Sequence, residues 1–193
     1  MKARELHIAP VDVKLVRDFI EQRHYSKSIN GVKISQCFGV YFNDDIVGAV
    51  LFGQLSTTAW KRFGETEREV LELRRLVLMD EAERNSESRV IGWCLRWIKK
   101  NLPEVRIIVS YADPMYGHSG VIYRASNFKH DGMTPPDKGF KDKNTGKVYH
   151  SRALRTRYKG EYKPFVKKLR KKLDEGLLEE IVLTGKHRFI YVI

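Results

Sequence analysis

The segment from Leu73 to Phe128 constrains the fold more than any other part of the chain. The apolar runs Leu73–Leu78 and Val105–Ala112 are each followed by polar turn residues and then by a helical pattern, so the segment reads as strand, turn, helix, strand, turn, helix. Two neighbouring strands that each lead into a helix N-terminus place backbone N–H groups at one edge of a sheet. The pattern therefore predicts an α/β fold with a cleft for an anionic or acyl-carrying ligand.

The remaining elements complete a central mixed sheet flanked by helices, in one domain over residues 1–193. We expect Thr134–Gly146, with its Pro135-Pro136 pair, to be a mobile loop. Further strands are predicted at Leu6–Ile8, Ser35–Phe42, Ile46–Gln54, Val70–Leu78, Lys147–Tyr158 and Lys186–Ile193, and helices at Val11–Arg23, Ser86–Lys100, Ser119–Ser126 and Pro164–Leu178.

Positive charge is concentrated at the C-terminal end of the chain. The formal net charge is +12, and residues 133–193 hold 16 Lys and Arg against 7 Asp and Glu, a balance of +9. Such a bias favours a polyanion as partner, nucleic acid above an anionic membrane surface, although a solvated basic surface has the same composition. No apolar run approaches the roughly 20 residues of a membrane span and the N-terminus lacks an apolar signal segment, so we expect a cytoplasmic protein without a membrane partner. The two cysteines, Cys37 and Cys94, are expected to be reduced core thiols.

Six short motifs together give the chain a family resemblance. They are Leu73-Arg-Arg-Leu-Val-Leu78, Asn85-Ser-Glu-Ser-Arg89, Tyr111-Ala-Asp-Pro114, Gly117-His118, Ile122–Phe128 and Lys186-His-Arg-Phe-Ile-Tyr191. The order of elements resembles the GNAT acyltransferase fold, with a basic C-terminal strand and helix extension. The motifs resemble the Mom family of Mu-like phages. The resemblance implies a transferase that converts adenine in phage DNA to N6-(carbamoylmethyl)adenine inside the bacterial host and so protects the DNA from restriction.

The expected donor loop departs from the GNAT pattern. GNAT relatives carry Arg/Gln-x-x-Gly-x-Gly/Ala before this helix, where glycines let the backbone wrap a diphosphate, whereas this chain has Glu83-Arg-Asn-Ser86-Glu-Ser88. Small serines still permit close approach, but the carboxylates of Glu83 and Glu87 oppose an anion. A plain helix start with Ser86 as N-cap is the alternative. The candidate donor-binding residues are Arg84, Asn85, Ser86, Ser88 and Arg89.

The implied product leaves the donor open between acetyl-CoA and glycyl-tRNA. The carbamoylmethyl group is attached through its CH2, so acetyl transfer alone does not give it, and that route would need an oxidation, for instance by iron. Transfer of glycine followed by rearrangement reaches the product without oxidation. No spacing of a metal site is present, and although His24, Asp113 and His118 could converge as two histidines and a carboxylate, we predict no metal site.

The candidate catalytic residues follow the first helix and the central strand. His24, with Tyr25 beside it, is placed to act as general base, or alternatively as a protonated helix C-cap. Asp113 and His118 follow the strand end, where open α/β sheets bind ligands, or alternatively form an Asp-Pro turn. Tyr123 matches the tyrosine that many GNAT enzymes use as general acid, with a core aromatic as the alternative.

The C-terminal third supplies the candidate nucleic-acid contacts. Tyr149 could act in catalysis by stacking on an extruded adenine, because chemistry on N6 requires the base to leave the helix. Five cations are expected to hold phosphates: Arg152, Arg155, Arg157, Lys167 and Lys171. The expected partner is double-stranded DNA, with tRNA and a second copy of the chain left open. Two other functions compete with this interpretation, namely an N-acetyltransferase that uses acetyl-CoA on another amine and a non-enzymatic nucleic-acid-binding module.

Overall fold

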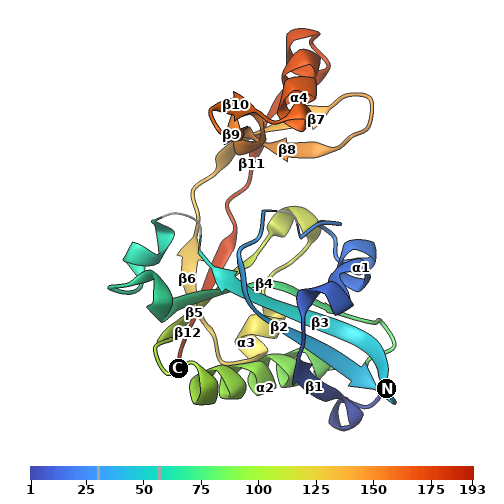
Figure 1. The fold of residues 1–193 in the computed structure, drawn as a ribbon, viewed down its shortest axis with the longest axis vertical. Coiled ribbons are helices and arrows are strands. Elements are labelled where there is room, and N and C mark those ends of the chain that lie inside the picture. Colours follow the sequence, from blue (N-terminus) through green and yellow to red (C-terminus); the bar gives the residue numbers. More distant parts are fainter. Residues whose placement is uncertain (30, 56–57) are drawn as a thin grey trace. The chain divides into compact units, whose positions relative to one another are not determined.

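The computed structural model describes residues 1–29, 31–55 and 58–193. Its contacts group into two compact units (Figure 1). The first, which we call the sheet unit, comprises residues 1–112, 118–132 and 187–193; the second, the basic unit, comprises residues 113–117 and 133–186. The basic unit carries 15 Lys and Arg against 8 Asp and Glu.

The sheet unit is built on a mixed seven-stranded sheet with the order β1-β2-β3-β4-β5-β12-β6. Antiparallel pairing joins β1 to β2, β2 to β3, β3 to β4 and β5 to β12, while β4 and β5 are parallel. The expected central mixed sheet is thus confirmed, with β5 in its interior. The strands are β1 His7–Pro10, β2 Ile34–Phe42, β3 Asp45–Gln54, β4 Val70–Leu78, β5 Ile107–Ala112, β6 Lys129–Met133 and β12 His187–Val192.

Helices cover both faces of this sheet (Figure 1). On one face, α1 (Val13–Arg23) buries Val16 and Ile20 in a cluster with Cys37 of β2. On the other, α2 (Ser86–Asn101) and the short α3 (Val121–Ala125) cover the main core, because the apolar residues of α2 recur with helical spacing. Both cysteines are buried and free, as expected. No helix in the described ranges is long and apolar enough to cross a membrane.

The basic unit contains three strands that were not predicted from the sequence, β7, β10 and β11. The expected loop Thr134–Gly146 holds β7 (Asp137–Asp142), the central strand of a small sheet with the order β11-β7-β8. Gly139 permits this pairing, since a Cβ there would lie 2.6 Å from the side chain of Leu183 in β11 (Leu178–Leu183). The expected helix ends at Asp174 and not at Leu178, because Gly176, at φ +72°, turns the chain into β11.

The single strand expected over Lys147–Tyr158 is also wrong. The segment forms β8 (Val148–His150), a 3-10 helix (Ser151–Arg155) and β9 (Arg157–Tyr158). The backbone N–H of Arg152 donates to Nδ1 of His150 at 3.2 Å, which caps the 3-10 helix and ends the strand. β9 pairs with β10 (Glu161–Tyr162), and α4 (Pro164–Asp174) follows.

One buried carboxylate organises the basic unit. Asp142 is fully buried; its Oδ1 accepts the backbone N–H groups of Asn144 and Thr145, and its Oδ2 accepts Nζ of Lys172 at 2.6 Å. The hydrogen bond from Lys172 lowers the pKa of this carboxyl below its ordinary value. The strand β7, the turn after it and α4 are therefore held by one side chain, next to a small core of Phe140, Leu154, Leu169 and Leu178.

Candidate functional site

The two parallel strands at the middle of the large sheet separate part of the way along. Pairing between β4 and β5 runs from Val70 and Ile107 to Leu73 and Ser110. Beyond that point, Leu76 to Leu78 pair with β3 on the other side, so this edge of β4 carries no β5 pairing within the described residues. An open strand edge inside a sheet presents backbone N–H and C=O groups to a ligand. We call this point the fork.

A bulge in β4 lies at the fork. Leu51 pairs with Arg75 and Phe52 with Leu73, which leaves Arg74 as the extra residue of β4. Bulges bend a strand and redirect side chains, and they are frequent beside active sites. At this position the bulge places the two arginines of the Leu-Arg-Arg-Leu motif beside the open edge.

Ser110 and Tyr123 mark the start of the fork. The buried hydroxyl of Ser110 donates to the carbonyl of Leu73 at 3.2 Å, and the hydroxyl of Tyr123 is hydrogen-bonded to Ser110. Burial raises the pKa of Tyr123, so its hydroxyl keeps its proton at neutral pH. The ring packs on Phe128 and Phe189, as a core aromatic does. Tyr123 is thus both a core residue and a proton-carrying group at the fork, and its role as general acid stays a prediction.

Three predicted catalytic side chains come together next to α1. The ring of Tyr25 lies between His24, at a centroid distance of 4.2 Å, and His118, at 5.1 Å. His24 is buried, whereas Tyr25 and His118 are exposed. The stack therefore connects a buried imidazole to the surface, and all three residues belong to the sheet unit.

His24 is held as a neutral hydrogen-bond donor. The backbone N–H of Ser26 donates to its Nδ1 at 3.1 Å, and the hydroxyl of Ser26 lies 2.8 Å from the same nitrogen. A neutral ring that accepts at Nδ1 carries its proton on Nε2. Burial, followed by the charges of Arg75 and His118, lowers its pKa to about 4. The protonated helix cap considered from the sequence is therefore wrong, although His24 does end α1. Because Nδ1 is occupied, this geometry favours donation from Nε2–H to a ligand over the predicted role of general base.

Arg74 and Arg75 were not among the functional residues predicted from the sequence. Arg75 donates to the carbonyls of Arg74 at 2.7 Å and of Ser28 at 3.3 Å, and Arg74 pairs with Glu72 at 3.3 Å. Burial lowers the pKa of Arg75 from its ordinary value. The Nε atoms of both arginines are buried without a hydrogen-bond partner in the described residues. Buried donors of this kind need an acceptor, so both guanidinium groups are suited to a ligand with carbonyl or anionic oxygens.

The expected donor loop is tied to the N-terminus of the chain. The backbone N–H of Glu83 donates to the carbonyl of Met1 at 3.0 Å, and a carboxylate oxygen of Glu83 accepts the N–H of Ala3 at 2.7 Å. Asn85, at φ +73°, is the N-cap of α2, so the alternative of Ser86 as N-cap is wrong. Ser86 is instead the first helical residue, and its buried hydroxyl has no partner among the described residues.

These contacts differ from those of a glycine loop that wraps a diphosphate. The N–H of Ser86 donates to the carbonyl of Glu83 at 3.2 Å, and the hydroxyl of Ser88 donates to the carbonyl of Asn85 at 3.0 Å. Two donors at the start of α2 are thus used internally, and the Glu83 carboxylate belongs to the same loop. Arg84 and Arg89 are exposed on this loop and remain candidates only for a contact at its surface.

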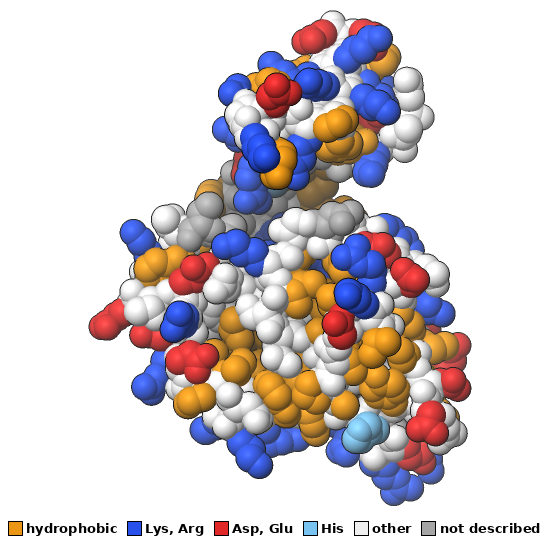
Figure 2. Space-filling model, viewed as in Figure 1, with side chains coloured by type: hydrophobic (Ala, Val, Ile, Leu, Met, Phe, Trp, Pro, Cys, Tyr) orange, Lys and Arg blue, Asp and Glu red, His pale blue; other side chains and the backbone are white. Residues whose placement is uncertain are grey.

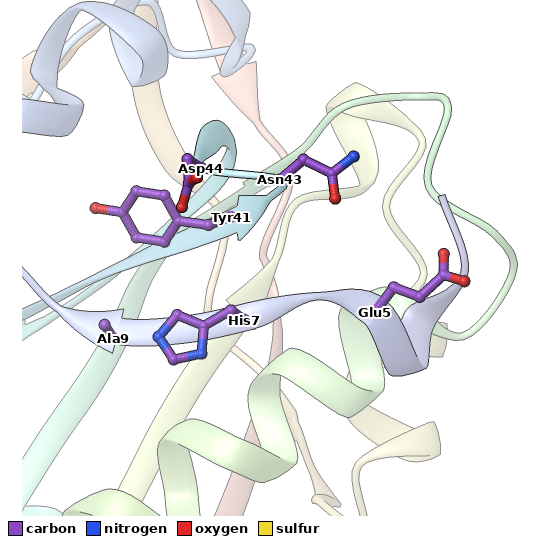
Figure 3. Close-up of a pocket in the computed structure, with 6 residues that line it drawn as sticks. All are labelled: Glu5, His7, Ala9, Tyr41, Asn43 and Asp44. Carbon is purple, nitrogen blue, oxygen red and sulfur yellow. The ribbon is translucent and has the colours of Figure 1, made fainter.

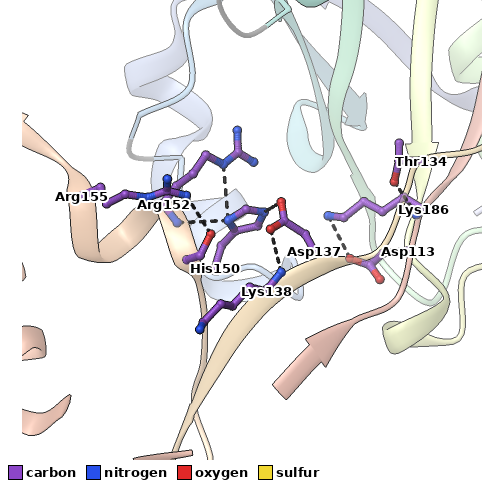
Figure 4. Close-up of polar contacts among 9 residues, drawn as sticks. Asp113, Thr134, Asp137, Lys138, His150, Arg152, Arg155 and Lys186 are labelled. Carbon is purple, nitrogen blue, oxygen red and sulfur yellow. Dashed lines mark hydrogen bonds and ion pairs between the residues drawn. The ribbon is translucent and has the colours of Figure 1, made fainter. Parts of the chain in front are cut away.

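Asp113 has a structural explanation. In the basic unit its Oδ1 accepts the N–H of Met115 at 3.1 Å, and its Oδ2 pairs with Nζ of Lys186 at 2.9 Å (Figure 4). This is the Asp-Pro turn considered as the alternative. Throughout the described ranges, no three His, Cys, Asp or Glu residues come together as a metal site, so the two histidines and Asp113 do not form one.

The predicted nucleic-acid contacts all lie in the basic unit. Tyr149 is half-buried against Phe165, at a ring distance of 5.9 Å. Arg152 reaches Nδ1 of His150, which is itself paired with Asp137 at 3.0 Å (Figure 4). In Figure 2, Lys and Arg cover much of the visible surface of β7–β11 and α4.

The other four predicted phosphate contacts are each engaged by neighbouring residues of the basic unit. Arg155 donates to the hydroxyl of Ser151 at 3.1 Å, and Arg157 to the hydroxyl of Tyr162 at 3.2 Å. Lys167 and Lys171 pair with Glu161 at 3.8 Å and with Glu175 at 3.7 Å. Such exposed pairs are weak and exchange readily for phosphate, so these cations remain available to a polyanion.

A separate pocket lies on the edge of the sheet unit. Its volume is about 430 Å³, and Glu5, His7 and Ala9 line it together with Tyr41, Asn43 and Asp44 (Figure 3). None of the residues predicted from the sequence is among them. Its two carboxylates make it unsuitable for an anionic substrate.

Comparison with solved structures establishes the fold. The chain is similar to NAA60 of Arabidopsis thaliana in complex with acetyl-CoA, with 10% identity and a TM-score of 0.53 over 97% of this chain and 99% of that one. It is also similar to a probable acetyltransferase of Staphylococcus epidermidis, with 11% identity and a TM-score of 0.52 over 97% and 98%. These likenesses confirm the expected GNAT-like fold.

Comparison of sequences establishes the family. The chain is 36% identical over 130 residues to the methylcarbamoylase Mom of Escherichia phage Mu, a match that covers 65% of this chain. The matched region spans 53% of that relative, about half its length. The model of the Mom protein family matches residues 5–193. The chain therefore belongs to the Mom protein family, as its motifs indicated.

Proposed function

We propose that this protein is a transferase that converts adenine in double-stranded DNA to N6-(carbamoylmethyl)adenine and thereby protects phage DNA from restriction. The observation that carries the proposal is the fork, where His24, Tyr123 and Arg75 surround an open strand edge in a chain of the Mom family. The methylcarbamoylase of phage Mu supports the reaction by its name.

The donor that agrees best with the charges is an activated glycyl ester such as glycyl-tRNA. Adenine N6 attacks the glycyl carbonyl, the ester C–O bond breaks, and the released oxygen takes a proton. The free glycyl amine then attacks C6 through a five-membered ring, the original C6–N6 bond breaks, and N6 becomes the terminal amide. This sequence gives carbamoylmethyladenine without an oxidant. Acetyl-CoA lacks the required nitrogen, and the Glu83 loop differs from a glycine loop that wraps its diphosphate.

The residues of the fork suit the first step. A tetrahedral intermediate places negative charge on the former carbonyl oxygen, and the Nε2–H of His24 and the guanidinium of Arg75 are donors of the kind that stabilise it. Tyr123, protonated at neutral pH, is suited to protonate the leaving oxygen. Removal of one such donor typically costs about 100-fold or more in rate.

The basic unit supplies the affinity for nucleic acid in this proposal. Its 15 Lys and Arg against 8 Asp and Glu suit a polyanion, and its exposed ion pairs are readily replaced by phosphates. The same surface could hold DNA, tRNA or both.

The test is mass spectrometry of nucleosides from plasmid DNA after expression of the protein in bacteria. A deoxyadenosine heavier by the carbamoylmethyl group is expected from the wild type, and at least tenfold less from Arg75→Gln and Tyr123→Phe. With 15N-glycine, the label should appear on the nitrogen bonded to the purine ring. Unmodified adenine with folded wild-type protein would refute the proposal and leave an acetyltransferase or a binding module. Modified adenine without label would refute the glycyl route alone.

A further inference from the structure

A short hairpin in the basic unit presents an aromatic side chain to solvent. Strands β9 and β10 are joined by Lys159 and Gly160, whose φ angles are +49° and +83°, a two-residue turn that fixes the register of the hairpin. Tyr158, directly before this turn, is 65% exposed. Figure 1 shows the hairpin beside α4.

The opposite face of the hairpin is anchored. Tyr162 lies between two guanidinium groups, that of Arg157 at 4.6 Å and that of Arg170 of α4 at 4.7 Å from its ring centroid. Arg157 also donates to the hydroxyl of Tyr162 at 3.2 Å and to the carbonyl of Gly160 at 3.4 Å. Because side chains alternate along a strand, this stack faces α4 and Tyr158 points the other way. The exposed ring therefore stands on a rigid support.

The charge around the hairpin favours nucleic acid as its ligand. Residues 157–168 contain five Lys and Arg and a single carboxylate, Glu161. A protein partner with an apolar surface would have to bury these cations, whereas nucleic acid neutralises them while its bases stack on an aromatic ring. Tyr149, the stacking residue expected from the sequence, packs on Phe165 in this unit and is less accessible. Tyr158 has the more open ring.

We propose that the β9–β10 hairpin is a wedge that enters the base stack of duplex DNA beside the target adenine, with Tyr158 replacing the stacking that the extruded base loses. The inference rests on the proposed function, since modification of N6 requires an extruded adenine. Lys159, whose Nζ lies 5.7 Å from the centroid of the Tyr158 ring, is the cation that holds phosphate beside the wedge. The hairpin recognises paired DNA and has no role once the base is already unstacked.

The test compares native and heat-denatured plasmid DNA as substrates for the purified protein in a bacterial extract, which supplies the donor. Modified deoxyadenosine is measured by mass spectrometry. Loss of base–aromatic stacking predicts about a tenfold decrease for Tyr158→Ala on native DNA. On denatured DNA the same variant should stay within about twofold of wild type, which also shows that it is folded. Tyr158→Trp should retain activity on both substrates.

Val182→Ala is the matched control, because Val182 is an exposed apolar residue of β11 in the same unit, 76% exposed. It should resemble wild type on both substrates. Equal activity of Tyr158→Ala and wild type on native DNA would overturn the wedge, and so would an equal loss on both substrates, or a preference for RNA over duplex DNA in competition. Absence of modification by the wild type on either substrate would instead overturn the proposed function, and the wedge with it.

Discussion

Replacement of His24 by asparagine should remove a large part of the pH dependence of stability. The carboxamide oxygen of asparagine occupies roughly the place of Nδ1, so it can still accept the N–H of Ser26, but it does not titrate. The folded protein holds the His24 pKa at about 4, against 6.5 as the ordinary value. Between these two values the unfolded chain binds a proton that the folded chain does not. Stability is therefore highest above pH 6.5 and falls as the pH is lowered toward 4.

The magnitude follows from proton linkage. The lowered pKa of His24 corresponds to a loss of about 2 kcal/mol in the free energy of unfolding between pH 7 and pH 5. Tyr25, which covers His24, is 41% exposed, so solvent screens part of this effect and we expect about 1–2 kcal/mol. Below pH 4 the ring is protonated in both states, and its contribution to the slope ends.

Urea unfolding followed by tryptophan fluorescence measures this difference in the relevant unit, because all three tryptophans, Trp60, Trp93 and Trp97, lie in the sheet unit. Between pH 7 and pH 5, the free energy of unfolding of the wild type should fall by about 1–2 kcal/mol more than that of His24→Asn. A His24 resonance that titrates near pH 6.5, or identical pH slopes for the two proteins, would refute the assignment of a buried neutral imidazole.

Four further experiments test the fold and the basic unit. Gly120→Ala places a Cβ 2.2 Å from the ring of Phe189 at φ +80° and should destabilise the sheet unit by about 2–5 kcal/mol in urea unfolding. Gly31→Ala, at φ +77° with open space around it, should cost only about 1–2 kcal/mol. Burial raises the pKa of Cys94 and raises that of Cys37 to about 12, so neither thiol should react with iodoacetamide at pH 8 until the protein is unfolded, as read by mass spectrometry. Lys167→Gln should lower the slope of log affinity for duplex DNA against log salt by about 1, as measured by fluorescence anisotropy, and an unchanged slope would remove this residue from the interface.

The sheet unit could be predicted because its elements carry a strong period. The expected strand Val70–Leu78 has the bounds of β4, and the helix expected at Ser86–Lys100 differs from α2 by one residue. Both segments bury a continuous apolar face, which leaves a clear sequence pattern. The fork could not be predicted, since it depends on how far β4 and β5 stay paired, and no pattern within either strand encodes that.

The strand β7 of the basic unit was not predicted because its sequence is strongly charged. In β7, Asp137-Lys-Gly-Phe-Lys-Asp142, the only large apolar residue is Phe140, so the segment resembles a polar loop. Its order comes from the buried Asp142 and its pair with Lys172, a contact over 30 residues. Propensity gives no signal for an element that is held by one carboxylate and by pairing with a later strand.

The candidate site could also be predicted only in part. His24, Tyr25 and His118 were expected at the site and do come together, because each follows the end of a well-predicted element. Asp113 was assigned to the expected site because it follows a strand end. At that position a turn cap and a catalytic carboxylate have the same sequence signature. The signal that deserved more weight was Arg74-Arg75 inside an apolar strand, since cations are almost never buried without a partner or a function.

The placement of charge also bears on the donor. At the loop before α2, the Glu83 carboxylate accepts the N–H of Ala3, the N–H groups of Glu83 and Ser86 are used internally, and Arg84 is an exposed cation. Two of the buried donors without a partner in the described residues, Nε of Arg74 and Nε of Arg75, lie at the fork, and the third, the hydroxyl of Ser86, lies at the start of α2. Positive charge for a large anion is concentrated in the basic unit instead. Within the proposed function, this distribution favours a donor that carries its anionic groups far from a small acyl ester, as an aminoacyl-tRNA does, over a compact diphosphate beside the thioester arm.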